Sequence, residues 1–156
     1  MRHLSTLLLL LLLATTAVSQ DAPAREDGDY NFDGYSDYRL PAEGPGNQCG
    51  WWNYFIFDPA ISDYRPVSTS LCREEFDAEQ KLVRSLVTGG MAGLIYTMRY
   101  FRWDGFELEA SSVEAQSYDP DRELFTFTRV TNLDALSGPT VISEILTREE
   151  AEKTLR

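Results

Sequence analysis

The chain has 156 residues, enough for one domain, and its 25 acidic and 14 basic side chains give a net charge of −11. This balance excludes a nucleic-acid-binding protein and argues against binding to an anionic membrane surface, because both need clustered lysine and arginine. The single histidine, His3, lies in a predicted signal peptide, so histidine-dependent catalysis and histidine-ligated zinc sites are excluded for the mature protein.

The first predicted element is a cleaved signal peptide over residues 1–19. Arg2 and His3 provide a basic start, an almost continuous apolar run extends from Leu4 to Ala14, and small residues precede Gln20, where we expect cleavage. The apolar run is about half of the ~20 residues that a membrane span requires. We therefore expect an exported, soluble, periplasmic protein with no membrane span, and with a net charge of −12 once Arg2 is removed.

Residues 20–28 are polar, contain proline and glycine and show no periodicity, which predicts a flexible leader before a single domain over 29–156. Cys49 and Cys72 are the only cysteines, and export to an oxidising compartment predicts a disulfide between them. An unpaired buried couple or a redox pair are the alternatives, although the chain has no C-x-x-C motif. The bridge would close a loop of about 24 residues, worth roughly 3–3.5 kcal/mol on the chain-entropy model.

Short segments rich in aromatic and β-branched residues predict antiparallel strands. The Asp104-Gly105 pair predicts a hairpin turn, glycine and proline make 41–50 a loop, and Thr147-Arg148-Glu149-Glu150 matches a capping box at the start of a helix. Residues 75–87 are ambiguous between helix and strand. The predicted strands are 51–57, 94–103, 106–109 and 124–130. We expect an all-β antiparallel sandwich or barrel-like domain with an N-terminal calcium loop and a short C-terminal helix.

The predicted calcium loop is Asp29-Tyr30-Asn31-Phe32-Asp33-Gly34-Tyr35-Ser36-Asp37. Alternate oxygen-bearing side chains and a glycine that permits a sharp turn are typical of a short loop wrapped around Ca²⁺, and an all-protein oxygen cage disfavours magnesium. An EF-hand would have glutamate at Leu40, so the shorter D-x-N-x-D-G-x-x-D form fits better. A surface turn without metal is the alternative, and Asp27 is a possible auxiliary ligand. The predicted ligands are Asp29, Asn31, Asp33, the Tyr35 carbonyl and Asp37.

This loop and the following Tyr54-Phe55-Ile56-Phe57-Asp58-Pro59 segment resemble FG-GAP-like calcium-loop periplasmic immunity proteins. Those proteins inhibit lysozyme-like effectors of bacterial-killing type IV secretion systems. The aromatic hairpin Tyr100-Phe101-Arg102-Trp103-Asp104-Gly105-Phe106-Glu107-Leu108 is similar too, and the resemblance covers roughly 27–110. It implies an all-β fold, a structural calcium ion, a strand over 81–88 and inhibition of a peptidoglycan hydrolase.

Three classes of function therefore remain. The first is an inhibitor of a cationic cell-wall hydrolase, since charge complementarity speeds encounter, with its inhibitory contact in 41–50 or 132–140. The second is a calcium-stabilised structural or carbohydrate-binding module, in which Trp51, Trp52 and Trp103 would stack on sugars, although aromatic strand residues more often pack in a core. The third is an enzyme with paired carboxylates. No carboxylate pair stands out in the sequence, so we expect no catalytic residues.

Overall fold

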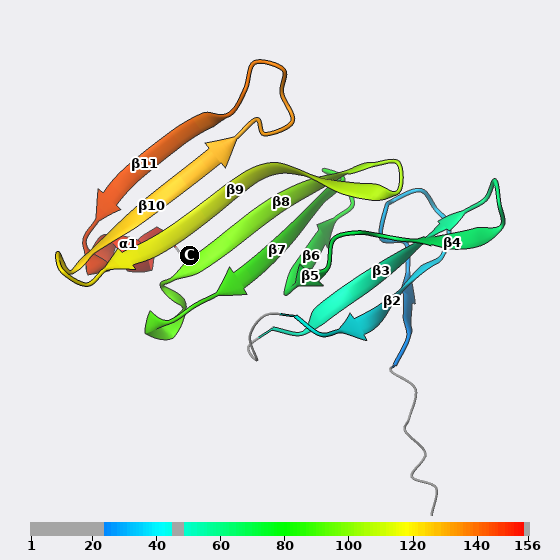
Figure 1. The fold of residues 1–156 in the computed structure, drawn as a ribbon, viewed down its shortest axis with the longest axis horizontal. Helices are drawn as coiled ribbons and strands as arrows, with labels where there is room; N and C mark the ends of the chain where they lie inside the picture. Colours follow the sequence, from blue (N-terminus) through cyan, green and yellow to red (C-terminus); the bar gives the residue numbers. More distant parts are fainter. Residues whose placement is uncertain (1–23, 45–48, 155–156) are drawn as a thin grey trace, which may run out of the picture.

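The computed structural model describes residues 24–44 and 49–154, so the predicted signal peptide lies outside the described residues. The described strands form two antiparallel sheets (Figure 1). The smaller sheet has the order β1-β2-β3-β4, with β5 also paired to β3, and consists of β1 (Glu26–Gly28), β2 (Asp37–Ala42), β3 (Trp51–Asp58), β4 (Asp63–Pro66) and β5 (Leu71–Cys72). The larger sheet has the order β11-β10-β9-β8-β7-β6 and consists of β6 (Glu74–Asp77), β7 (Leu82–Thr88), β8 (Tyr96–Asp104), β9 (Glu107–Asp119), β10 (Leu124–Thr131) and β11 (Thr140–Leu146).

The predicted all-β antiparallel class with a short C-terminal helix is confirmed. The helix is α1 (Arg148–Thr154), and a 3₁₀ turn, η1 (Met91–Gly93), precedes β8. The capping box is formed as predicted, because the Glu150 carboxylate accepts from both the main-chain N–H and the hydroxyl of Thr147, each at 2.8 Å. The ambiguous stretch is a hairpin of β6 and β7, in which Phe76 lies opposite Val83.

Several predicted boundaries are wrong. The leader does not extend to residue 28, because β1 pairs with β2, and the loop expected to begin at 41 begins later, because Pro41 lies opposite Trp52 within the sheet. The strand expected over 106–109 continues to Asp119 as β9. These segments are polar or mixed in composition, so it is their position beside an already formed neighbouring strand that makes them extended.

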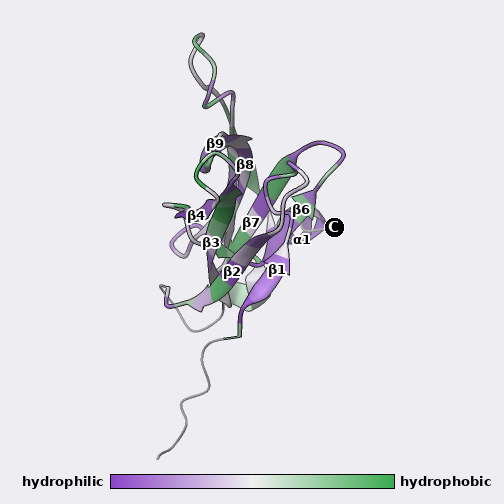
Figure 2. Ribbon diagram, turned by 90° about the vertical axis from the view of Figure 1, so that its right-hand side faces the viewer, coloured by the Kyte–Doolittle hydropathy of each residue, from purple (hydrophilic) through white to green (hydrophobic). Residues whose placement is uncertain are grey.

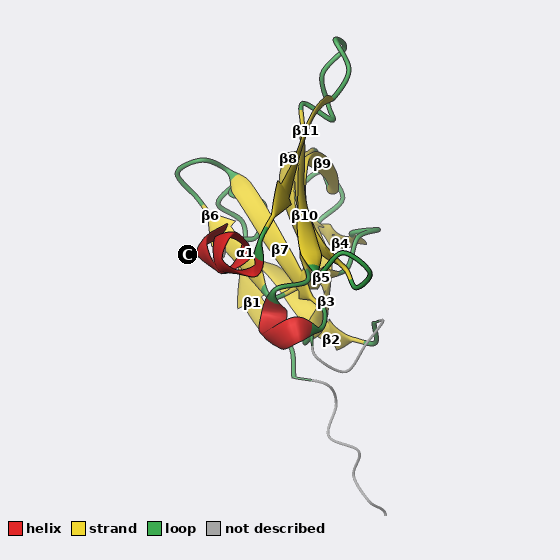
Figure 3. Cartoon of the chain, turned by 90° about the vertical axis from the view of Figure 1, so that its left-hand side faces the viewer, coloured by secondary structure: helices red, strands yellow, loops and turns green. Residues whose placement is uncertain are grey.

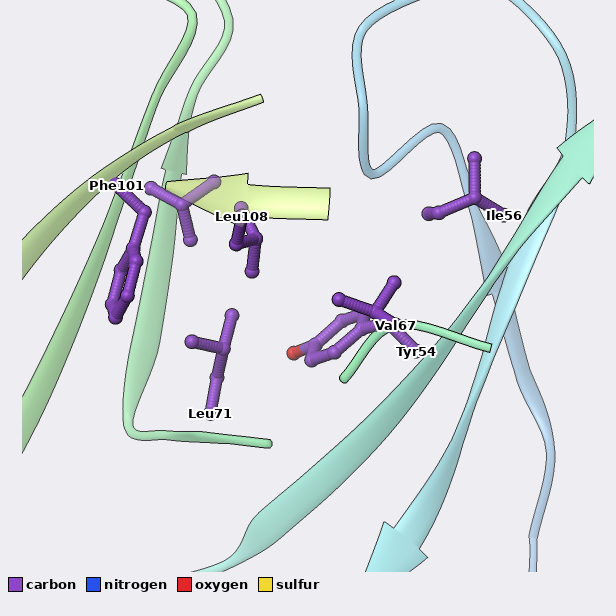
Figure 4. Close-up of a cluster of buried hydrophobic side chains, with 7 residues drawn as sticks. Tyr54, Ile56, Val67, Leu71, Phe101 and Leu108 are labelled. Carbon is purple, nitrogen blue, oxygen red and sulfur yellow. The ribbon is translucent and has the colours of Figure 1, made fainter. Parts of the chain in front are cut away.

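One hydrophobic core joins the two sheets (Figure 4). Side chains alternate between the faces of a strand, so β3 directs Tyr54 and Ile56 inward, where both are fully buried. The larger sheet contributes Val83, Phe101 and Leu108 from β7, β8 and β9. Figure 2 shows apolar residues, in green, in β3 and β7.

A second, smaller cluster holds α1 against the far half of the larger sheet, where β9, β10 and β11 extend beyond the smaller sheet (Figures 1 and 3). Leu94, Phe125 and Ala151 form its centre. Gln116 is buried beside it and donates to the Leu94 carbonyl at 2.8 Å, while its own carbonyl accepts from the Thr154 hydroxyl at 2.9 Å. The helix is therefore held by both apolar packing and buried hydrogen bonds.

The predicted disulfide between Cys49 and Cys72 is present, with the two Cα atoms 5.6 Å apart. Cys72 also lies opposite Trp51 in the β3–β5 pairing, so the bridge reinforces a pairing of strands. In the described ranges, no helix has both the length and the apolar character to cross a membrane.

Candidate calcium-binding loop and the adjoining cleft

The loop between β1 and β2 alternates core contacts with oxygen-bearing side chains. Tyr30 and Phe32 pack against the main core, and the Tyr30 ring lies 5.1 Å from that of Tyr54. Gly34 has φ +90°, a conformation that favours glycine and that makes the sharp turn predicted for this position. The two aromatic anchors fix the loop on the core and leave the alternate positions for polar chemistry.

Three predicted ligands fold back onto the backbone of the loop. The two carboxylate oxygens of Asp29 accept from the N–H groups of Asp33 and Gly34, both at 3.0 Å. Asn31 accepts from the same Asp33 N–H at 3.3 Å and donates its amide to the Asp33 carboxylate at 2.8 Å. Asp33 also accepts from the Tyr35 N–H at 2.9 Å. The loop thus gathers two carboxylates and one amide around adjoining donors.

Asp37, the first residue of β2, is the fully buried member of the predicted set. One of its oxygens accepts from the main-chain N–H groups of Tyr30 at 2.8 Å and Asn31 at 3.4 Å, and the other from that of Phe57 at 2.9 Å. Burial raises the pKa of Asp37, and these donors act in the opposite direction. In the structure Asp37 ties the start of the loop to β3.

Asp27, the possible auxiliary ligand, is not directed into the loop. Its exposed carboxylate pairs with Arg25 at 2.7 Å. Tyr35 follows the glycine turn, and its ring packs 5.6 Å from that of Phe57.

The chemistry of this donor set fits calcium, because every predicted ligand atom is an oxygen and three of the residues are carboxylates. Over residues 24–44 and 49–154, no group of three or more acidic, cysteine or histidine side chains is arranged so that it could hold a metal ion. The loop's oxygens are satisfied instead by main-chain N–H groups. Carboxylate oxygens have further lone pairs, so these hydrogen bonds do not prevent the same oxygens from binding a metal ion. Because the side chains are not arranged around one point, Asp29 and Asp33 would have to turn toward a shared centre to bind it.

A cleft of about 640 Å³ adjoins the loop. Its lining includes Asp33 from the loop and Arg102, Trp103 and Phe106 from the β8–β9 hairpin. The Trp103 indole donates to the Tyr30 carbonyl at 2.9 Å, so the hairpin is tied directly to the loop. The cleft is lined by Asn31, Phe32, Asp33, Asp58, Pro59, Lys81, Arg102, Trp103, Gly105 and Phe106. It therefore combines aromatic surface with charges of both signs.

Two charged features around this site have no local signal in the sequence. Lys81 comes from the β6–β7 turn and reaches the cleft only through the tertiary fold. Arg39 forms ion pairs with Glu26 of β1 and Glu74 of β6, and its guanidinium lies 4.1 Å above the Trp52 ring. These partners are separated in sequence by 13 and 35 residues, so no local motif connects them.

The three tryptophans proposed as a sugar platform do not share one surface. Trp51 and Trp52 are consecutive in β3 and therefore point to opposite faces. Trp52 and Trp103 pack against the main core. Comparisons with family models, with curated proteins and with solved structures find no match to this chain.

Proposed function

We propose that this chain is a calcium-binding protein in which the loop over residues 29–37 holds one Ca²⁺. The observation that carries the proposal is the convergence of Asp29, Asn31 and Asp33 on the same turn of backbone. Calcium takes six to eight oxygen ligands in flexible geometry, and the Tyr35 carbonyl and Asp37 extend the set. The ion offsets repulsion among the carboxylates, so its role is structural.

Calcium binding is tested by thermal unfolding with calcium and with chelator. A ligand that binds only the native state raises stability by mass action, so the midpoint should rise with calcium in the wild type. Asp33→Ala should abolish this rise. Asp121→Ala is the matched control, because Asp121 is an exposed aspartate in the β9–β10 turn and should retain the full rise. An unchanged wild-type midpoint, or an equal rise in Asp33→Ala, refutes the calcium site.

We further propose that the protein is periplasmic and inhibits a cationic peptidoglycan hydrolase. The resemblance to lysozyme-directed immunity proteins and the acidic charge support this. The 132–139 loop between β10 and β11 adds support, because it projects from the end of the larger sheet (Figures 1 and 3). Its Leu136 side chain has a relative exposure of 108%, and Leu133 is also exposed. These two leucines give the loop exposed apolar surface.

Main-chain hydrogen bonds brace the loop although it projects. Leu133 donates its N–H to the Ser111 carbonyl at 3.1 Å, and Gly138 donates to the Ala135 carbonyl at 3.0 Å. A preorganised loop loses less conformational entropy on binding than a flexible one. The other candidate, 41–50, includes residues 45–48, which lie outside the described residues.

Inhibition is tested by wall clearing with lysozyme-like hydrolases, including any encoded beside this gene, at low and moderate salt. The wild type should block the enzyme, and Leu136→Ser should weaken inhibition, whereas Ile61→Ser, at another exposed apolar position, should not. Full hydrolase activity at stoichiometric excess, with no complex formed, refutes the inhibitor. Calcium-dependent stability is measured separately and does not depend on this result.

The alternative is a calcium-stabilised structural or carbohydrate-binding module, and the cleft beside the loop is the observation that favours it. Trp103 and Phe106 offer apolar surface for sugar rings, and Asp58 and Arg102 offer groups for hydroxyls. Soluble peptidoglycan fragments should then change the tryptophan fluorescence of the wild type and have less effect on Arg102→Ala. No change at millimolar fragment refutes this alternative.

A further inference from the structure

The β10–β11 hairpin carries most of the exposed apolar surface in the described chain. Of the seven large hydrophobic side chains that are exposed, five lie between Leu133 and Ile145. Three of them belong to β11, where Val141, Ile142 and Ile145 have relative exposures of 62%, 47% and 58%. Such a concentration marks an interaction surface.

β11 is also an unprotected sheet edge. It is the terminal strand of the larger sheet, so its outer N–H and C=O groups have no strand partner among the described residues (Figure 1). Proteins usually protect such edges with short strands, charged residues or proline. The other end strands follow this rule: β1 has three residues, two of them acidic, β4 contains Arg65 and Pro66, and β6 has three acidic residues. β11 has seven residues, and Glu144 is its one charged side chain.

The spacing within β11 is complementary to a second copy of itself. Val141 and Ile145 each lie two residues from Ser143, and the period of two in a strand puts all three on one face. When two β11 strands pair antiparallel around a two-fold axis at Ser143, Val141 of each copy lies opposite Ile145 of the other. The axis therefore creates two apolar cross-strand pairs at once, as an isologous interface requires.

Charge does not oppose this register at short range. The Glu144 side chain lies opposite Ile142 of the second copy, and the two Glu144 residues are diagonal neighbours about 7–8 Å apart. The alternative axis at Glu144 would place the two carboxylates directly opposite each other, which is destabilising. The remaining repulsion comes from the overall negative charge and is screened by salt.

We propose that the protein forms a homodimer through antiparallel pairing of β11 with β11 of a second copy, with the two-fold axis at Ser143. The two larger sheets then become one continuous sheet, and Val141 and Ile145 of each copy gain apolar neighbours across the new strand pair. The two 132–139 loops lie at opposite ends of the interface, because the paired strands run in opposite directions.

The oligomeric state is measured by light scattering and sedimentation over a range of protein and salt concentrations. The wild type should have the mass of two chains and dimerise more tightly as salt rises. Ile145→Lys should weaken dimerisation about tenfold or more, because it places a charge at both apolar pairs. Ile61→Lys is the matched control, since Ile61 is 55% exposed in the β3–β4 turn, and should leave the dimer intact. Equal thermal midpoints would show that both variants fold.

The register is tested with single cysteine variants, since the two natural cysteines are bridged to each other. Ser143→Cys should form a covalent dimer under mild oxidation, because residues directly opposite in an antiparallel pair have Cα atoms within disulfide range. Ile142→Cys should cross-link much more slowly, because Ile142 lies opposite Glu144 of the second copy and the two Ile142 residues are only diagonal neighbours. Equal rates overturn the register. A wild type that stays monomeric at the highest concentration overturns the dimer. The free edge of β11 would then be expected to pair with an extended segment of a different protein.

Discussion

Replacing Asp37 separates its structural contribution from any part it has in metal binding. Its carboxylate is fully buried and accepts from three main-chain N–H groups, those of Tyr30, Asn31 and Phe57. Leaving a buried donor unsatisfied costs roughly 1–3 kcal/mol. Two of the three bonds are short, so Asp37→Ala should lower the free energy of unfolding by about 3–4 kcal/mol.

Asp37→Asn should cost about half as much. The amide keeps one oxygen acceptor, but it turns an NH₂ group toward the N–H on its other side, so at least one donor is lost. The control is Asp63→Asn, because the exposed Asp63 carboxylate accepts only from the N–H of the adjacent Tyr64. A surface change of this kind should stay within about 0.5 kcal/mol.

The assay is urea unfolding followed by tryptophan fluorescence, first in chelator and then in calcium. An unchanged m-value permits direct comparison of the variants. The loss in chelator measures the contribution of Asp37 to the fold, and any additional loss in calcium measures its contribution to ion binding. If Asp37→Ala lies within about 0.5 kcal/mol of the wild type in chelator, the structural argument for Asp37 is wrong.

Three further predictions concern stability elsewhere in the chain. Replacing Cys49 and Cys72 together by serine should cost roughly 3 kcal/mol in urea unfolding, and intact-mass analysis of alkylated wild type should find no free thiol; two alkylated cysteines would contradict the bridge. Gln116→Ala should cost about 1–3 kcal/mol, because it leaves the Leu94 carbonyl unpaired, and faster proteolysis of α1 should accompany the loss; an unchanged helix would contradict the anchoring role. The hydrogen bond from Arg65 lowers the pKa of Asp58, so this carboxylate contributes stability above its unfolded pKa that is lost as pH falls through its folded pKa. Asp58→Asn should therefore reduce the loss of stability below about pH 4, and an identical acid profile for the two proteins would contradict this.

Sequence alone was sufficient wherever the signal is local. The strand at 51–57 alternates inward and outward side chains, and the Thr147 capping box and the Asp104-Gly105 turn depend on neighbouring residues. The disulfide followed from composition and expected compartment, because two cysteines allow only one intramolecular pairing. The spacing of oxygen-bearing residues predicted a loop over 29–37, and Asp29, Asn31 and Asp33 do fold onto one turn of backbone, while calcium binding there stays a prediction.

Tertiary structure decided what depends on partners distant in the chain. The ambiguous 75–87 stretch is a hairpin because β7 pairs with β8 and buries Val83 in the main core. The function of Asp37 as an anchor depends on the Phe57 N–H, 20 residues away. The free edge of β11 is likewise invisible in a sequence, because it is set by the order of strands in the sheet. Burial and pairing are properties of the assembled fold, and periodicity reports them only where one face of a strand is buried and the other exposed.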